Sequence, residues 1–169
     1  GEGADSSEAP SQLLQDLVLG EEGEPASGPV SRKILIVDDQ FFNIQALRTI
    51  LVQIAGIDFD EICQSASNGR EALRVIQQNV DTVGQGEACS YQLILMDCNM
   101  PYMDGYESCD RIRQFLYDRQ LDQPAIVAVT GHTEKIYVER ALNSGMNIVF
   151  SKPVHVPTLL NLLKQLELK

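Results

Sequence analysis

Acidic side chains follow two apolar segments, and their type and spacing suit the binding of a divalent cation. Asp38 and Asp39 come directly after the run 33–37, and Asp97 comes directly after the run 91–96. Adjacent carboxylates at the end of a buried strand are costly unless a cation meets them. The pair has no Cys or His nearby, and such hard oxygen donors favour Mg²⁺ over zinc or copper. The alternative is a solvated turn whose acids cap a following helix.

A hydroxyl group and an ammonium group follow two further apolar segments. Thr130 comes after the run 124–129 and precedes Gly131, and Lys152 lies two residues beyond the short run 147–150. If the four segments are parallel strands, their polar side chains converge, because ligands bind at the carboxyl ends of strands in open α/β sheets. Three carboxylates, a hydroxyl and an ammonium at one edge form a site for a divalent cation and a phosphoryl group.

The elements that must position these side chains alternate along the chain from Arg32 onward. A weak strand near 61–66 brings the strands to five, and we expect a polar loop at 79–90. Five β–α units in succession predict an α/β fold: a flavodoxin-like, doubly wound (βα)5 sandwich with a parallel five-stranded sheet in the order 2-1-3-4-5. The expected helical stripes are Ile44, Leu47, Leu51 and Ile54 before Gly56; Ala72, Leu73 and Ile76 after Asn68-Gly69; Tyr106, Cys109, Ile112 and Leu116; residues 133–143; and Val156, Leu159, Leu160, Leu163 and Leu166.

The net charge of −11 is concentrated near the beginning of the chain. Residues 1–30 carry seven acidic side chains and no Lys or Arg, which leaves −4 for residues 31–169. Because the first segment is also rich in Gly, Ser, Pro and Ala, we expect residues 1–30 to be a disordered acidic linker or tail and residues 31–169 to be one domain. An apolar island at 13–18 indicates a transient helix, or one or two turns that dock on the domain.

Composition argues against several classes of function. An acidic chain lacks the basic footprint of a nucleic-acid-binding protein. No apolar stretch is long enough for a transmembrane helix and no signal segment is visible, so we expect a cytoplasmic protein without membrane insertion. Dinucleotide binding lacks support, because no GxGxxG motif follows the first strand. The cysteines show no metal-ligand spacing and are expected to be reduced thiols: Cys63, Cys89, Cys98 and Cys109.

Four segments together match one protein family in the right order. They are IVDD at 36–39, MDCNMPYMDG at 96–105, VTG at 129–131 and SKP at 151–153. Over residues 32–168 the chain resembles the receiver domains of two-component response regulators. Asn43 and the segment 96–101 are most similar to receivers appended to hybrid histidine kinases. No DNA-binding domain follows the fifth helix, and the resemblance therefore implies a receiver cut from a larger kinase.

The resemblance assigns a role to each residue of the expected site. It implies that Asp97 is the phosphoacceptor, whose carboxylate attacks a phosphohistidine and forms an acyl phosphate. Asp38 and Asp39 would hold Mg²⁺, for which Mn²⁺ can substitute, together with Asp97 and the backbone carbonyl of Asn99. The metal would offset the charge among carboxylate and phosphoryl oxygens.

The same resemblance implies roles for the residues around the phosphoryl group. Lys152 would pair first with Asp97 and then with a phosphoryl oxygen, and its bond to Pro153 is usually cis in the family. Thr130 would donate its hydroxyl to the phosphoryl group, while Gly131 leaves the path open. The segment 103–105 would form a tight turn that caps the third helix.

The implied partners are the phosphohistidine-bearing dimerisation domain of a histidine kinase and a histidine-phosphotransfer protein. Phosphorylation would switch the face formed by the fourth helix, fifth strand and fifth helix. The module would catalyse only its own phosphorylation and slow dephosphorylation, so it is not expected to be an enzyme in its own right, although its parent can be a kinase. As a kinase receiver it would be the cytosolic part of a larger, membrane-bound protein.

Two features depart from the family pattern, and two alternative functions compete. Val149 stands where the family commonly has Tyr or Phe, so an aromatic readout of the movement of Thr130 is in doubt. His132 stands at a position that commonly tunes dephosphorylation, or it is a simple surface histidine. The nearer alternative is a stand-alone, single-domain regulator. The more distant one is a Mg²⁺-dependent phosphatase with an aspartyl nucleophile, which needs an acid where this chain has Asn99.

Overall fold

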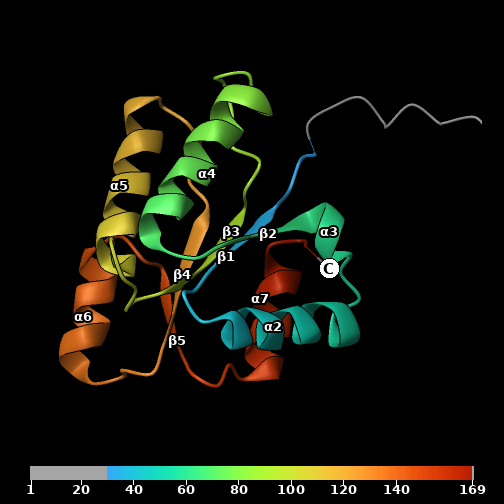
Figure 1. The fold of residues 1–169 in the computed structure, drawn as a ribbon, viewed down its shortest axis with the longest axis vertical. Helices are drawn as coiled ribbons and strands as arrows, with labels where there is room; N and C mark the ends of the chain where they lie inside the picture. Colours follow the sequence, from blue (N-terminus) through green and yellow to red (C-terminus); the bar gives the residue numbers. More distant parts are fainter. Residues whose placement is uncertain (1–29, 169) are drawn as a thin grey trace, which may run out of the picture.

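The five strands of the domain form one parallel sheet. The computed structural model describes residues 30–168, and the strands pair in the order β2-β1-β3-β4-β5 (Figure 1). The predicted order is therefore confirmed. The strands are β1 (Ile34–Val37), β2 (Cys63–Ala66), β3 (Leu93–Asp97), β4 (Ala125–Thr130) and β5 (Ile148–Ser151).

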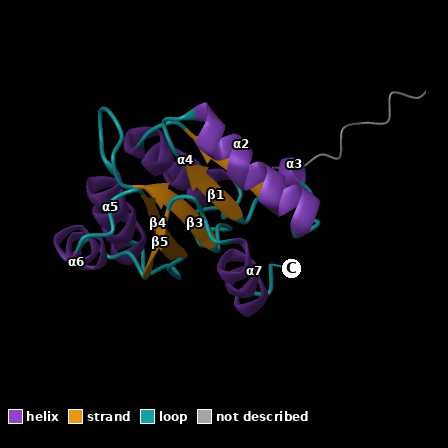
Figure 2. Ribbon diagram, turned by 90° about the horizontal axis from the view of Figure 1, so that it is seen from below, coloured by secondary structure: helices purple, strands orange, loops and turns teal. Residues whose placement is uncertain are grey.

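The central strands are buried because helices cover both faces of the sheet. Along β1, Leu35 and Val37 pack into one apolar cluster, while Ile34 and Ile36 pack into the other. This division follows from the alternation of side chains along a strand, and it explains why the strand sequence is continuously apolar. Figure 2 shows the resulting three layers, with α4, α5 and α6 on one face and α2, α3 and α7 on the other.

The two longest helices begin at residues whose side chains cap them. These are α4 (Gly69–Thr82) and α5 (Gly105–Asp118). Asn68 Oδ1 accepts from the N–H of Glu71 at 2.9 Å, and Asp104 Oδ1 accepts from the N–H of Glu107 at 2.9 Å. Such caps satisfy backbone donors that the first helical turn leaves free. The predicted cap at the start of the third helix is confirmed.

The remaining helices of the described chain complete the two layers that cover the sheet. They are α2 (Phe41–Thr49), η1 (Ile50–Ile54), α3 (Phe59–Ile62), α6 (Lys135–Asn143) and α7 (Val156–Gln165). Leu159 and Leu163 of α7 are fully buried, and Leu162, which the stripe did not include, is buried as well. None of the helices in residues 30–168 has the length and apolar character to cross a bilayer.

The first helix does not keep its α-helical form to Gly56, as its stripe had predicted. It changes to the π-helical turn η1, in which the N–H of Ala55 donates to the carbonyl of Ile50 at 3.0 Å. A π turn is wider than an α turn, so it rotates the residues that follow out of phase. Leu51 stays fully buried, whereas Ile54 is 49% exposed. Placing Ile54 in the buried stripe was therefore wrong.

Two boundaries in the central part of the chain also differ from expectation. The predicted loop at 79–90 begins later, because α4 continues to Thr82. Asn79 is buried and holds the loop closed: its Nδ2 donates to Ser90 Oγ at 2.7 Å, and its Oδ1 accepts from the N–H of Ser90 at 2.8 Å. The weak strand near 61–66 is shortened by the helical turn α3, whose first turn Asp58 caps. The expected tail and the apolar island at 13–18 lie outside the described residues.

Candidate functional site

The polar residues predicted from the four strand ends lie at the carboxyl edge of the sheet. The register places Val37 beside Met96, Asp97 beside Val129 and Thr130 beside Ser151. Because the strands are parallel and in register, the residues that follow each strand emerge at the same edge. Four segments that are far apart in the sequence therefore supply one site.

Three carboxylates form the centre of this edge. Asp38, Asp39 and Asp97 each offer an oxygen, and these oxygens lie within 4.8 Å of one another. Asp38 and Asp97 are only 3% and 6% exposed, while Asp39 is half-buried. A compact set of oxygen donors without sulfur or imidazole is the kind of site that Mg²⁺ prefers. The residues present therefore fit a magnesium ion.

Lys152 supplies the positive charge of the site. Its Nζ lies 2.9 Å from Asp38 Oδ2 and 3.3 Å from Asp97 Oδ1. Burial opposes the charged form of this ammonium, but the hydrogen bonds and charges of Asp38 and Asp97 outweigh burial and raise the pKa of Lys152. The Lys152–Pro153 peptide bond is cis, as the resemblance implied. The predicted pairing with Asp97 is present, and the shorter contact to Asp38 was not foreseen.

The pKa of Asp97 is raised above the ordinary value of a solvated carboxyl group. Burial, followed by the nearby charge of Asp38, raises the pKa of Asp97 to about 6, although Lys152 and the N–H of Asn99 favour the ionised form. That N–H donates to Asp97 Oδ1 at 3.4 Å. The site thus confines negative charge that its single ammonium only partly offsets, and a divalent cation would complete the balance.

Asp38 is held in one orientation by three donors. The N–H of Gln40 donates to its Oδ1 at 2.8 Å, Asn43 Nδ2 donates to the same oxygen at 3.2 Å, and Lys152 binds Oδ2. Charge-assisted bonds of this kind fix a carboxylate more firmly than contacts with water. Asn43 was noted only through the resemblance. Gln40 contributes through its backbone N–H, and the residue type at this position gives no indication of that bond.

Thr130 is 2% exposed at the end of β4, and its Oγ1 accepts from the N–H of His132 at 3.1 Å. The His132 side chain itself is exposed, and its ring lies 5.1 Å from that of Tyr137 on α6. The hydroxyl of Thr130 therefore belongs to the turn that connects the site to α6.

A glycine that sequence reasoning treated only as part of a turn proves important for the geometry of the site. The N–H of Gly105 donates to the carbonyl of Cys98 at 2.9 Å. A Cβ at this position would collide with the backbone carbonyl of Asp97, and it would lie 2.9 Å from Cys98 Cα. The start of α5 can therefore pack directly against the end of β3, where Asp97 lies, only if residue 105 has no side chain. The signal was the sequence Asp104-Gly105, which is typical of a helix start.

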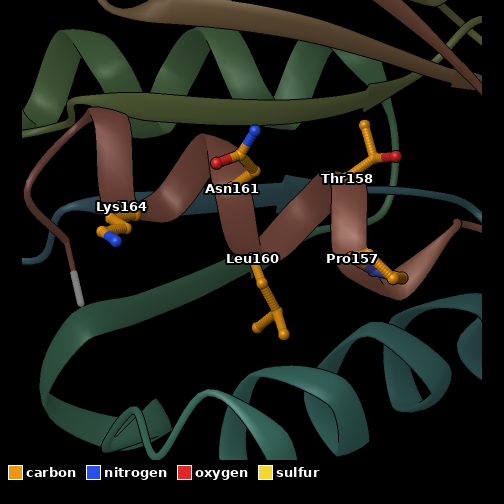
Figure 3. Close-up of a pocket in the computed structure, with 5 residues that line it drawn as sticks. All are labelled: Pro157, Thr158, Leu160, Asn161 and Lys164. Atoms are coloured by element: carbon orange, nitrogen blue, oxygen red, sulfur yellow. The ribbon is translucent and has the colours of Figure 1, made fainter.

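Two hollows of the surface are relevant to the search for a site: one borders the acidic residues, and the other runs along α7. One of about 140 Å³ begins at Asp38 and Lys152 and extends between the helix after β1 and the loop after β5; Asn43, Ala46, Leu47, Ile50, Val129, Pro153 and Val154 complete its lining. A larger and more open hollow of about 880 Å³ runs along α7, where Leu160 points toward α2 (Figure 3). Its lining residues are Pro157, Thr158, Leu160, Asn161 and Lys164. The lining residues of this larger hollow include no acidic side chain. The site at the strand ends is therefore the better candidate for a reactive site.

A comparison with protein families gives a match over nearly all of the described residues. The model of the family described as "Response regulator receiver domain" matches residues 34–164. Among curated proteins, the chain is 32% identical over 128 residues to hybrid signal transduction histidine kinase A of Dictyostelium discoideum. It is 34% identical over 132 residues to two-component system protein A of Emericella nidulans.

Solved structures give the same likeness. The receiver domain of the histidine kinase CKI1 from Arabidopsis thaliana, complexed with Mg²⁺ and BeF3⁻, is 27% identical with a TM-score of 0.68, covering 82% of this chain and 91% of that one. A second match is a co-crystal structure of the Saccharomyces cerevisiae histidine phosphotransfer signaling protein Ypd1 and the receiver domain of its downstream response regulator Ssk1. This match is 27% identical with a TM-score of 0.61, covering 76% of this chain and 83% of that one.

The curated relatives are much longer than the region they share with this chain. The match covers 76% of this chain but 5% of the Dictyostelium protein, and 78% of this chain but 17% of the Emericella protein. The likeness therefore concerns one module of those proteins.

Proposed function

Because this chain belongs to the response regulator receiver family of two-component signalling, we propose that Asp97 accepts a phosphoryl group from a phosphohistidine in a Mg²⁺-dependent reaction. The observation that carries this proposal is the cluster of three carboxylates with one ammonium at the carboxyl edge of the sheet. Nucleophile, charge partner and metal-binding oxygens come from separate strand ends, and the fold holds them together.

Asp97 would be the nucleophile of the transfer. One oxygen of its carboxylate would attack phosphorus, the phosphorus–nitrogen bond of the donor would break, and the imidazole would leave as the neutral base after taking up a proton. A bound Mg²⁺, or Mn²⁺ in its place, would offset the negative charge of the carboxylates and of the phosphoryl oxygens. Asp38 and Asp39 would hold this ion with Asp97 and the backbone carbonyl of Asn99.

Lys152 and Thr130 would respond to the new phosphoryl group. Lys152 already bridges Asp38 and Asp97, so its ammonium is placed to bind a phosphoryl oxygen once Asp97 has become an acyl phosphate. The hydroxyl of Thr130 would turn from the N–H of His132 and donate to another phosphoryl oxygen. Gly131 presents no side chain to this path. Asn99 provides no proton donor for hydrolysis, so we expect slow loss of the phosphoryl group rather than enzymatic turnover.

The surface beside the acidic cluster suits a helical phosphotransfer partner. Phe41 and Phe42 begin α2 immediately after the acidic pair, and they are 67% and 83% exposed. Exposed aromatic side chains next to a reactive group are typical of a protein-binding surface. The likeness to the receiver seen with Ypd1 supports a histidine-phosphotransfer protein as the partner, and a kinase phosphohistidine domain would use the same approach.

We place this receiver in a hybrid histidine kinase. The curated relatives named above include such kinases, and this chain corresponds to a small part of them. In this arrangement residues 1–30 would be the acidic linker and residues 31–169 the receiver domain, on the cytoplasmic side of the parent protein.

Intact-mass measurement after incubation with acetyl phosphate tests the proposal. We expect one added phosphoryl group in the presence of Mg²⁺, none with EDTA, and none in Asp97→Asn. Asp110→Asn is the matched control, because it removes an exposed carboxylate that lies on α5. This variant should be phosphorylated like the original protein. Absence of the adduct from the original protein, or an adduct that persists in Asp97→Asn, would refute the assignment of Asp97.

A further inference from the structure

The hollow that borders the acidic cluster has no part in the proposed phosphoryl transfer. Its volume is about 140 Å³, and it lies between α2, the π-helical turn η1 and the loop that follows β5. A cavity of about 150 Å³ is large enough to hold benzene. The hollow therefore has room for a single six-membered ring.

The helix α2 leaves this space open because it presents a small side chain at one point. Ala46 contributes only a methyl group, whereas the next residue, Leu47, is buried in the apolar cluster of that face. The greater part of the lining is apolar: Ala46, Leu47, Ile50, Val129, Pro153 and Val154. Water beside such walls makes few hydrogen bonds, so an apolar ring can displace it favourably.

The remaining lining residues, Asp38, Asn43 and Lys152, form a polar end. The Lys152 ammonium carries three N–H donors, and across residues 30–168 its contacts with Asp38 and Asp97 account for two of them. Asn43 donates from its Nδ2 to Asp38, and no residue in the described part of the chain donates to its amide oxygen. One donor and one acceptor are thus available where the hollow meets the acidic cluster.

The charges at the polar end favour a neutral occupant. An anion would lie beside Asp38, whose carboxylate already shares Lys152 with Asp97. A cation would lie against the Lys152 ammonium and would lose its hydration to the apolar walls. A hydroxyl group carries no charge, and it can accept from Lys152 while it donates to the amide oxygen of Asn43.

We propose that this hollow is a binding site for a small neutral molecule made of one apolar ring and one hydroxyl group, such as a phenol or a cyclic alcohol. The ring packs between Ala46, Ile50 and Val154, and the hydroxyl bonds Lys152 and Asn43.

Occupancy of the hollow has a consequence for Asp97, which rests on the proposed function. Lys152 and Asn43 both bind Asp38, and the occupant holds them in that arrangement. Phosphorylation requires Lys152 to release Asp97 and bind a phosphoryl oxygen. The bound molecule therefore slows the formation of the acyl phosphate.

Phenol and toluene are matched probes, because one carries a hydroxyl group where the other carries a methyl group. In titrations followed by ¹H–¹⁵N NMR, we expect phenol to shift the amide signals of residues 43–50, 152 and 154. It should bind at least threefold more tightly than toluene, although toluene is the more apolar molecule. Absence of these shifts would overturn the site. Toluene binding as tightly as phenol would overturn the polar end and the chemical class drawn from it.

A variant that fills the hollow tests the location of the site. Ala46→Leu adds a larger side chain from α2 and should weaken phenol binding at least tenfold. Ala88→Leu makes the same change at an exposed loop position outside the hollow, and it should bind phenol like the original protein. Unchanged phenol binding in a folded Ala46→Leu protein would overturn the site. If Ala46→Leu does not fold, the comparison of phenol with toluene in the original protein decides alone.

Phosphorylation by acetyl phosphate with Mg²⁺ tests the consequence for Asp97. Saturating phenol should lower the initial rate of adduct formation at least twofold in the original protein and in Ala88→Leu, but not in Ala46→Leu. A rate that phenol leaves unchanged would overturn the restraint on Lys152. Absence of the adduct without phenol would instead refute the proposed function, whereas the NMR titrations would still decide whether the hollow binds phenol.

Discussion

Two buried carboxylates share one ammonium group in the resting site. Lys152 contacts both Asp38 and Asp97, but Asp38 also accepts from Gln40 and Asn43, so it is the better stabilised of the two. Asp97 keeps the less satisfied charge, which agrees with its raised pKa. A carboxylate that is poorly stabilised in the resting state gains most from a cation or from conversion into an acyl phosphate.

The raised pKa of Asp97 predicts that this residue destabilises the fold at neutral pH. Its pKa of about 6 in the folded protein is above the ordinary value of 3.8, so its favourable contribution is present below pH 3.8 and is lost as pH rises through 6. A shift of roughly two units corresponds to at most about 3 kcal/mol. Without metal, Asp97→Asn should therefore raise the free energy of unfolding at about pH 7.5 and have little effect at about pH 4.

Urea denaturation in EDTA at the two pH values measures this difference. Asp110→Asn serves as the control, because that carboxylate is exposed. Equal stability of Asp97→Asn and the original protein at neutral pH would show that Lys152 already compensates the charge of Asp97.

At the residue scale, the sequence predicted the types of the site residues better than their contacts. Asp38, Asp39 and Asp97 could be brought together by reasoning because each directly follows an apolar run. The bonds to Asp38 from the N–H of Gln40 and from Lys152 could not be predicted, because they depend on backbone direction and on neighbours from other elements.

At the scale of elements, the start of α5 sets the position of Asp97. Gly105 packs against the backbone of Asp97 and Cys98, and Asp104 caps the helix that begins there. Gly69 makes a similar close approach: a Cβ there would lie 2.6 Å from the carbonyl of Met103. The turn between β3 and α5 is thus held from two sides by close backbone contacts that larger residues would prevent.

Two glycines near the site should respond differently to an added methyl group. Gly105→Ala places Cβ against the backbone of Asp97, and we expect it to lower the free energy of unfolding by about 3 kcal/mol. Gly131→Ala meets no atom within 4 Å and should change stability by no more than about 0.5 kcal/mol. Thermal or urea denaturation compares the two.

A phosphorylation assay adds a second contrast between these variants. Because Gly131 borders the proposed path of the phosphoryl group, Gly131→Ala should slow formation of the adduct while the fold stays intact.

The stability prediction for Gly105→Ala has its own contradicting outcome. A Gly105→Ala protein as stable as the original would show that α5 can shift without disturbing β3.

Whole elements were predicted where hydrophobic periodicity was regular. The stripe of α5 is confirmed, since Tyr106, Cys109, Ile112 and Leu116 are all buried. The exposed position of Ile54 could not be predicted, because a single π turn changes the phase of a helix without a change in residue type. The end of α4 was missed because buried Asn79 is polar, and only its pairing with Ser90 explains it.

At the scale of the whole molecule, the strand order collects negative charge at one edge of the sheet. β1 and β3 are adjacent in the sheet, so Asp38 and Asp97 lie at the ends of neighbouring strands. The fold therefore carries an electrostatic cost at this edge, and a bound cation would relieve it.

Magnesium should accordingly stabilise the entire domain. At a free Mg²⁺ concentration ten times the dissociation constant, mass action adds about 1.4 kcal/mol to the free energy of unfolding. For a domain of this size, Tm should rise by about 3 to 8 °C. Differential scanning fluorimetry with increasing MgCl2 measures the rise. Asp39→Asn removes a proposed ligand that makes no contact with Lys152, so it should abolish most of it, and Asp110→Asn should leave it unchanged. An equal rise in Asp39→Asn would place the ion elsewhere.

Lys152 supplies the ammonium group of the site and lies 114 residues along the chain from Asp38, one of the two carboxylates that it contacts. During synthesis, Asp38 and Asp97 leave the ribosome long before Lys152, so the early chain holds like charges without their counterion. A product that stops before β5 would have to bury these carboxylates without their ammonium partner in order to close its sheet, which is unfavourable. Lys152 therefore makes the last strand a requirement for a stable fold, and incomplete chains would stay open to chaperones and proteases.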